Sequence, residues 1–206
     1  MSRELFNGLW LTEHRKSGKM IDKDSIMFSH PPFCQSRNVG VCSRCYSKKL
    51  SGYRPFLAGK QIQNTQILSS PGFEPCKLNT IDNTIRWGSF GELTDPVMYR
   101  NINRMAEYNP HLLHLLWTKR NGIVKSYHKA KNLKLVWSAT KLDVQKPFVP
   151  DGYDIGFFVY TDESKIPKTW SDGRKMRNVM ICNKECSKCK FCYSTYLGGV
   201  VAEVVR

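Results

Sequence analysis

The sequence contains no run of eighteen apolar residues and no signal-peptide pattern. A membrane-spanning helix needs roughly 20 consecutive apolar residues. The first residues, MSRELFNGLWLTEHRKSGK, place charges on both sides of a very short apolar stretch, unlike a secretory leader. These absences lead us to expect a cytoplasmic protein that makes no use of a membrane.

Acidic residues are scarce. The 206 residues include 17 Asp and Glu against 32 Lys and Arg, for a net charge of +15 and a pI near 9.6. A charge of this sign attracts polyanions, and nucleic acid is the commonest of these inside cells. No helix-turn-helix or other named nucleic-acid-binding motif is present in the sequence. Charge alone therefore predicts this partner.

A dense basic stretch runs from Lys119 to Lys146, and tryptophan and tyrosine residues are interleaved with it. Basic side chains would contact phosphates while the aromatic rings stack on bases. The plain alternative is a solvated basic face. The candidate nucleic-acid-binding residues are Lys119, Arg120, Lys125, Lys129, Lys131 and Lys134.

Internal repeats and low-complexity tracts are absent as well, and 206 residues fit one domain. We expect a single domain over residues 1–206, with a loop-rich part at 1–80 and a β/α part at 81–206. Each part carries one cluster of cysteines.

Strand patterns recur about every twenty residues along the second part. Apolar or alternating segments predict strands at 84–90, 111–119, 133–138, 155–160, 179–182 and 199–206, besides one or two strands within 1–30. Helix signals come between the first two of these: Thr94 or Asp95 is the predicted N-cap, Pro96 lies in the first turn and Asn109-Pro110 ends the helix. A further helix is expected to begin near residue 46 and to end by Gly52 and Pro55. This order predicts an α/β fold with a mainly parallel sheet.

The eight cysteines are Cys34, Cys42, Cys45, Cys76, Cys182, Cys186, Cys189 and Cys192. Nothing in the sequence marks secretion, and thiols two residues apart are poor disulfide partners because the short ring strains the bridge. The same spacing suits a metal, since a tight loop directs both sulfurs inward. Metal binding is therefore the favoured interpretation.

The later cluster, Cys182, Cys186, Cys189 and Cys192, supplies four thiolates, enough to complete the coordination of zinc or of an iron–sulfur cluster. Lysines 184, 188 and 190 alternate with these cysteines and are expected to keep the sulfurs ionised. Four-cysteine zinc sites usually pair two hooks about a dozen or more residues apart. Crowding into eleven positions favours a 4Fe-4S cluster, with zinc as the alternative metal.

The earlier cluster, Cys34, Cys42 and Cys45, supplies only three thiolates. Three leave one corner of a 4Fe-4S cluster without a protein ligand, and an open metal position is where chemistry can occur. Cys76 and His30 are candidate fourth ligands. Cys76 fits equally well as a small core residue.

Three motifs carry a family resemblance. Cys42, Cys45 and Tyr46 form C-x-x-C-Y, Arg86-Trp87 with Gly91-Glu92 form a second motif, and the later cluster ends in Cys192-Tyr193. Together they resemble the "gene product 88" family of phages and mobile elements, over roughly residues 30–195. The resemblance implies a phage-like origin in an infected or carrying host cell, and a bound cluster.

A more distant likeness is to radical S-adenosylmethionine enzymes. In those enzymes three cysteines hold a 4Fe-4S cluster, a glycine-glycine-glutamate stretch follows the next strand, and the sheet forms a partial (β/α) barrel. The likeness implies that the earlier cysteines hold the reactive cluster and that Gly88, Ser89, Gly91 and Glu92 bind the cofactor, with Glu92 as the catalytic residue. The first cysteine spacing here is seven residues instead of three, and Ser89-Phe90 interrupts the glycines.

Three functions follow as hypotheses. The first is an iron–sulfur enzyme, radical-generating in type, that acts on nucleic acid or nucleotides. The second is a non-enzymatic nucleic-acid-binding protein stabilised by zinc or an inert cluster. The third is a base-modifying enzyme with carboxylate catalysis at Glu92, Asp95 or Asp162, although these side chains fit better as helix caps or surface charges. His111 and His114 are expected to be structural.

Overall fold

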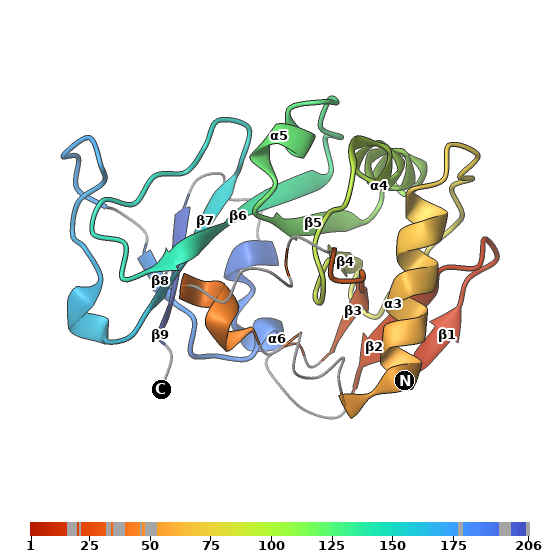
Figure 1. Ribbon diagram of the computed structural model, residues 1–206, viewed down its shortest axis with the longest axis horizontal. Coiled ribbons are helices and arrows are strands. Elements are labelled where there is room, and N and C mark those ends of the chain that lie inside the picture. The colour runs from red at the N-terminus through yellow and green to blue at the C-terminus, as the bar shows by residue number, and fades with distance from the viewer. Residues whose placement is uncertain are drawn as a thin grey trace.

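Nine strands form one sheet in the computed structural model, which describes residues 1–15, 20, 22–31, 34, 40–45, 47, 53–176, 179–193 and 199–204 (Figure 1). Within these residues the strands are β1 (Ser2–Glu4), β2 (Trp10–His14), β3 (Lys23–Ile26), β4 (Thr84–Trp87), β5 (Leu113–Thr118), β6 (Leu133–Leu142), β7 (Ile155–Tyr160), β8 (Val179–Ile181) and β9 (Gly199–Val204). Their order in the sheet is β1-β2-β3-β4-β5-β6-β7-β9-β8.

The sheet is mainly parallel. The pairs β1–β2 and β2–β3 are antiparallel, and every later pair from β3–β4 to β9–β8 is parallel. Since β1 and β8 are the two ends of the strand order among the described residues, the sheet is open and does not close into a barrel. The predicted α/β class is confirmed.

The described helices are α3 (Pro55–Leu68), α4 (Pro96–Tyr108), α5 (Asn121–Val124) and α6 (Cys186–Cys189), with 3-10 turns η1 (Gly40–Arg44), η2 (Glu163–Lys165) and η3 (Phe191–Tyr193). None of the described helices combines the length and the apolar character that crossing a bilayer requires.

Helix α4 begins where the sequence signals predict. The Asp95 carboxylate accepts a hydrogen bond from the Met98 N–H at 2.8 Å, Pro96 is the first helical residue, and Asn109 ends the helix. A cap of this kind satisfies an N–H group that has no partner within the helix.

The helix expected from residue 46 falls mostly on residues 46 and 48–52, which lie outside the described part of the chain. Ser47 and Tyr53 are helical, Arg54 is not, and a separate helix, α3, begins at Pro55. Proline is tolerated at the first helical position because that position needs no N–H donor. At the N-terminus the structure has three strands where one or two were expected.

The two faces of the sheet are packed differently. On one face α3 and α4 cover an apolar core that includes Ile26, Ile85, Trp87 and Leu116. Successive side chains of a strand point to opposite faces, so Arg86, between Ile85 and Trp87, lies on the other face. We call this the inner face.

The inner face carries a second apolar cluster, made by Val136, Ile155, Phe157, Val159 and Val201. The segments that pack on this cluster come from both cysteine-bearing regions. Val41 of η1 contributes from the first region, and Cys182, Phe191 and Cys192 contribute from the second.

The strand order explains why the later cysteines reach the inner face. Up to β7 the parallel strands advance in one direction along the sheet, but β9 lies between β7 and β8, so the step from β8 to β9 runs backwards. Crossovers between parallel strands are right-handed in almost all proteins. A backward step therefore places its connection on the opposite face from the earlier helices. Figure 1 shows α6 in this position, between the β1–β3 end and the β7–β9 end of the sheet.

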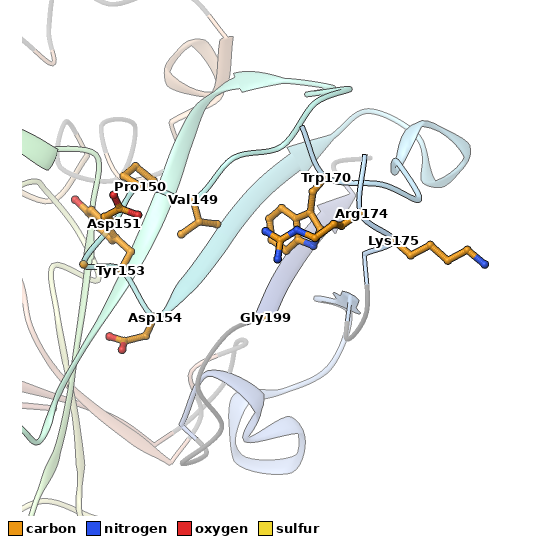
Figure 2. A pocket seen from close by; sticks show the side chains of 10 residues that line it. Val149, Pro150, Asp151, Tyr153, Asp154, Trp170, Arg174, Lys175 and Gly199 are labelled. Carbon is orange, nitrogen blue, oxygen red and sulfur yellow. The ribbon is translucent and has the colours of Figure 1, made fainter. Parts of the chain in front are cut away.

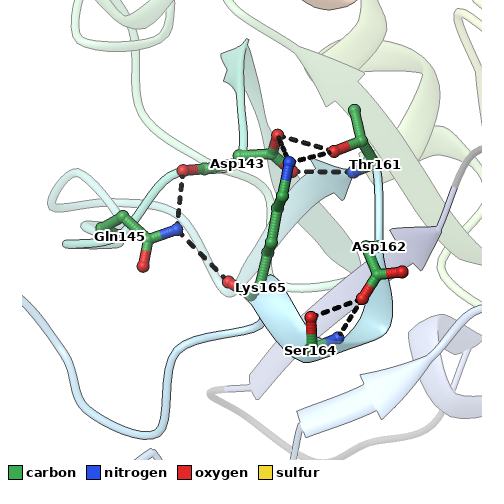
Figure 3. A network of polar contacts seen from close by, with 6 residues as sticks. All are labelled: Asp143, Gln145, Thr161, Asp162, Ser164 and Lys165. Carbon is green, nitrogen blue, oxygen red and sulfur yellow. Dashed lines mark hydrogen bonds and ion pairs between the residues drawn. The ribbon is translucent and has the colours of Figure 1, made fainter.

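A network of polar contacts joins the segments that follow the carboxyl ends of β6 and β7 (Figure 3). The Asp143 carboxylate accepts hydrogen bonds from the N–H and the hydroxyl of Thr161, both at 2.7 Å, and pairs with Lys165 at 3.0 Å. Asp162 accepts the Ser164 N–H at 2.8 Å and caps η2. Asp162 is therefore a structural cap, like Asp95.

Candidate functional site

The first cysteine group lies at the carboxyl edge of the parallel strands. The Cys34 N–H donates to the Pro31 carbonyl at 2.8 Å, Cys42 belongs to η1, and the Cys45 N–H donates to the Cys42 carbonyl at 3.3 Å. Gly40, at the start of η1, is so close to Thr140 near the end of β6 that a side chain would overlap the Thr140 carbonyl oxygen. The parallel strands end at this edge, where α/β proteins collect their binding residues.

The three thiols of this group interact with one another. Burial, together with the negative charge of Glu92 and the neighbouring thiols of Cys42 and Cys45, raises the pKa of the Cys34 thiol to about 11. Lys119 opposes them. The structure therefore brings the three predicted ligands together, close to Glu92 and Lys119.

Residues 88–92, the predicted cofactor-binding stretch, run against the segment that leads to Cys34. The Phe28 N–H donates to the Phe90 carbonyl at 2.9 Å, and the Glu92 N–H donates to the Ser29 carbonyl at 3.4 Å. Gly91 has a positive φ of 82°, and a side chain there would overlap the Phe28 carbonyl oxygen. The glycine is thus required by a close backbone approach.

Ser89 and Glu92 are both buried and both hydrogen-bonded within the protein. The Ser89 hydroxyl donates to Ser25 on β3 at 2.9 Å. One Glu92 oxygen accepts from the Thr118 hydroxyl at 2.6 Å and from the Leu93 N–H at 2.8 Å, and the other accepts from the Lys119 N–H at 3.0 Å. These contacts make Glu92 a link between the ends of β4 and β5.

The second cysteine group lies on the inner face of the sheet. The Cys182 N–H donates to the Ala202 carbonyl at 2.7 Å and so extends the β8–β9 pairing, while Cys186 and Cys189 are the first and last residues of α6. Burial raises the pKa of the Cys192 thiol to about 12, and the thiols of the other three cysteines raise it as well. The other three predicted ligands therefore all lie within electrostatic range of Cys192.

The cations that act on this second group come from the sheet. Arg86 of β4 and Lys23 of β3 both oppose the burial-driven rise in the Cys186 pKa. The loop lysines, which the sequence suggested for this role, are exposed at positions 184, 188 and 190. Lys188 pairs with Glu185 at 2.7 Å instead. The sequence signals for Arg86 were its place in the Arg86-Trp87 motif and its charge in the middle of a predicted strand.

The donor chemistry of both groups fits a soft metal centre, because thiolates select zinc and iron–sulfur clusters. In a tetrahedral zinc site, Zn–S bonds of about 2.3 Å hold the sulfurs within about 4 Å of one another. No three Cys, His, Asp or Glu side chains in the described ranges are grouped closely enough to hold a metal ion.

Of the candidate fourth ligands, Cys76 lies elsewhere, whereas His30 lies beside residues 88–92. Cys76 is buried in the core beneath α3 and α4, where its N–H contacts the Met105 sulfur at 3.4 Å and its carbonyl accepts from Asn109. It is therefore on the face of the sheet away from both cysteine groups. His30 bonds through Nε2 to the Ser47 hydroxyl at 2.8 Å, and the Gly91 N–H also donates to that hydroxyl.

The basic stretch does not form one exposed surface. Lys134 is buried on β6, where Cys192 is among the charges that act on it, and Lys129 pairs with Asp154 at 2.7 Å. Lys125 and Lys131 are exposed, whereas Lys119 and Arg120 are half-buried just beyond β5. Of these, only the last two lie beside the first cysteine group.

The aromatic residues of that stretch are also dispersed. Trp117 points to the inner face and packs on Phe157, with ring centroids 4.6 Å apart, and Trp137 packs on Tyr153. The basic and aromatic side chains of this stretch alternate in the sequence, but the fold places them in different parts of the structure.

His114 is structural. It lies on β5, fully buried, and its Nδ1 accepts a hydrogen bond from the Trp87 indole at 3.0 Å. Burial lowers the pKa of His114 to about 3. The imidazole is therefore neutral at ordinary pH.

A cavity of about 760 Å³ opens at the amino ends of β7 and β9 (Figure 2). Its lining includes Tyr153, Asp154, Trp170, Arg174 and Gly199, and no cysteine is among its lining residues. Because Asp154 precedes β7 and Gly199 begins β9, this cavity lies at the opposite edge of the sheet from Glu92.

Comparison with known proteins gives one match. A protein-family model described as "Gene product 88" matches residues 10–195, a range that includes both cysteine groups and residues 88–92. No curated protein and no solved structure matches the chain.

Proposed function

Because this chain belongs to the gene product 88 family over residues 10–195, we propose that it is a phage-type iron–sulfur protein with a radical S-adenosylmethionine-like site. In this proposal Cys34, Cys42 and Cys45 hold a 4Fe-4S cluster with one iron open. The second cysteine group holds a closed cluster. The substrate is a nucleic acid or a nucleotide.

The observation that carries the proposal is the position of the first cysteine group in the strand order. The three cysteines fall between β3 and β4, the stretch 88–92 follows β4, and β3 to β7 are neighbouring parallel strands in chain order. This succession is the one that the likeness to radical S-adenosylmethionine enzymes predicts, although here the sheet is open.

The cysteine spacing favours a cluster over a single zinc ion. Four-cysteine zinc sites usually pair two hooks about a dozen or more residues apart, whereas Cys182, Cys186, Cys189 and Cys192 fall within eleven positions. When bound, a cluster with an open iron supplies one-electron reduction of a sulfonium cofactor.

The protein's own residues would prepare the site. Gly91 lets the backbone after β4 approach the segment that leads to Cys34, and Glu92 fixes the ends of β4 and β5 beside it. Because both Glu92 oxygens already accept hydrogen bonds, we assign Glu92 a positioning role, with any cofactor contact made by backbone groups of residues 88–92.

A polyanionic substrate is supported by the net charge of +15. Lys119 is a cation of the basic stretch beside the first cysteine group, Arg120 follows it in the chain, and the Lys141 backbone lies against Gly40 of η1. A phosphate held there would lie at the same edge of the sheet as the thiols. Binding of this kind weakens steeply as salt rises.

The decisive experiment is anaerobic purification followed by iron, sulfide and zinc analysis and by visible absorption. The proposal predicts a brown protein that dithionite bleaches, and loss of part of the iron in the Cys34/Cys42/Cys45→Ser variant. A colourless protein with stoichiometric zinc would instead support the zinc-stabilised, non-enzymatic nucleic-acid-binding alternative.

Cleavage of S-adenosylmethionine tests the enzymatic half separately. Reduced protein should release 5′-deoxyadenosine, and the triple serine variant should release none. A brown protein that leaves S-adenosylmethionine intact would contradict the radical assignment while leaving the cluster in place.

A further inference from the structure

Arg86 comes from the middle of β4, far in sequence from the second cysteine group, yet it meets that group in space. It lies on the inner face, and its guanidinium stacks over the Trp117 ring at 4.1 Å from the centroid. One of its nitrogens also contacts the Met20 sulfur at 3.3 Å. These contacts hold the guanidinium in one direction, because a planar group stacked on an indole has little freedom.

Three neighbours of the guanidinium belong to the second cysteine segment. Cys186, Cys192 and Tyr193 all lie within electrostatic range of Arg86. Cys192 and Phe191 pack on the same apolar cluster that Trp117 contacts. The guanidinium and the thiols therefore lie on the same inner face of the sheet, around Trp117.

Lys23 of β3 supplies a second cation to the same place. Its side chain is 2% exposed and lies over the Tyr193 ring at 4.5 Å from the centroid. It pairs with Asp82 on its other side. Tyr193 follows Cys192 directly in the chain, so the lysine lies beside the second cysteine group.

A metal centre with four thiolates needs such compensation. A divalent ion bound by four thiolates carries a net charge of about −2, and an oxidised 4Fe-4S cluster with four thiolates carries about the same. Burying an uncompensated charge is costly unless an opposite charge lies close. Among the described residues, Arg86 and Lys23 lie near this group, and Lys134 of β6 also interacts with Cys192.

We propose that Arg86, with Lys23 beside it, is the counter-charge of an anionic tetrathiolate centre at the second cysteine group, and so holds that centre against the sheet. This inference rests on the proposed function, since it presumes a bound centre. In this inference Arg86 is a positioning residue, and the loop lysines at positions 184, 188 and 190 do not compensate the charge of the centre.

The test uses the full-length chain with Cys34, Cys42 and Cys45 replaced by serine, so that only the second group can be loaded. Iron and sulfide are supplied anaerobically, and two quantities are measured: the midpoint reduction potential and the rate of iron release to a chelator. The variants are Arg86→Gln, Arg86→Lys and, as a control with the same loss of charge in the loop, Lys184→Gln.

Loss of the guanidinium should make the potential more negative, because the reduced centre is the more anionic form. It should also speed iron release by about ten-fold or more, the usual cost of losing a group that supports metal ligands. Arg86→Lys should keep the reduction potential and the rate of iron release close to those of the parent protein. Lys184→Gln should change neither quantity. A purely structural arginine would not be rescued in potential by lysine.

Two outcomes overturn different claims. If the parent protein takes up no cluster at the second group, the proposed function of that group fails. If the cluster forms and Arg86→Gln has the same potential and release rate as the parent, the counter-charge inference fails while the proposed function stands. Circular dichroism identifies a variant that does not fold, and Arg86→Lys then carries the comparison.

Discussion

Gly91 lies directly against the backbone of Phe28: a side-chain carbon at position 91 would overlap the Phe28 carbonyl oxygen and lie 2.6 Å from the Ser29 oxygen. The segment after β4 and the segment that leads to Cys34 are therefore in backbone-to-backbone contact. That contact sets the distance between residues 88–92 and the first cysteine group.

Gly91→Ala should destabilise the protein by about 2–4 kcal/mol, since it adds both a clash and a positive-φ strain. Chemical denaturation measures this free energy of unfolding. The matched control is Gly59→Ala, because Gly59 lies within α3 with nothing close to its missing side chain. The control should be neutral or stabilising by about 0.5–1 kcal/mol. Equal stability of the two variants would refute the close contact.

Glu92→Ala should lower the free energy of unfolding by about 3 kcal/mol, because it leaves the Thr118 hydroxyl and the N–H groups of Leu93 and Lys119 without their shared acceptor. Glu163, which is exposed, provides the control: Glu163→Ala should change stability by no more than about 0.5 kcal/mol. If Glu92→Ala denatures like wild type yet abolishes activity, the carboxylate is catalytic instead of positioning.

His114 should make stability depend on pH below neutrality. Its folded pKa of about 3 lies below the unfolded value of 6.5, so the unfolded chain takes up a proton first as pH falls. The contribution of the neutral His114 side chain to the free energy of unfolding is fully present above pH 6.5. It is lost at about 1.4 kcal/mol per pH unit as the pH falls from 6.5 to 3.

The measurement is the difference in free energy of unfolding between wild type and His114→Gln across that range. Glutamine can still accept the Trp87 hydrogen bond, so the variant removes the titration and keeps the contact. A difference that does not change with pH would contradict the buried neutral imidazole.

Cys76→Ala should leave the iron content unchanged, since Cys76 lies in the core beneath α3 and α4. Its cost should be about 1 kcal/mol of stability from the lost packing. Cys189→Ala, in the second group, should lose iron. Iron analysis of the two variants side by side checks the assignment, and a loss of iron in Cys76→Ala would make Cys76 a ligand.

Much of the fold was predictable because its signals are local. The cap at Asp95, the proline at the first position of α4 and the apolar runs of β5 and β7 act within a few residues. Pro55 acts in the same local way: Arg54 before it is not helical, and Pro55 begins α3 at the first helical position, where no N–H donor is needed.

The candidate site was predictable only in part. The cysteine spacings identified both groups of thiols as candidates, and the strand pattern put residues 88–92 after a strand. The basic stretch failed as a surface, because burial separated Lys134 from the exposed Lys125 and Lys131. A run of basic residues in the sequence does not show which of their side chains are exposed and which are buried on a strand.

By itself the sequence determined the strands, the capped helix α4 and the two sets of thiols, since each depends on neighbours along the chain. Only the tertiary structure decided that the second set lies on the inner face, against Arg86 and Lys23. The reason is topological: the step from β8 back to β9 sends its connection across the other face of the sheet. That reversal joins residues more than a hundred positions apart in the sequence.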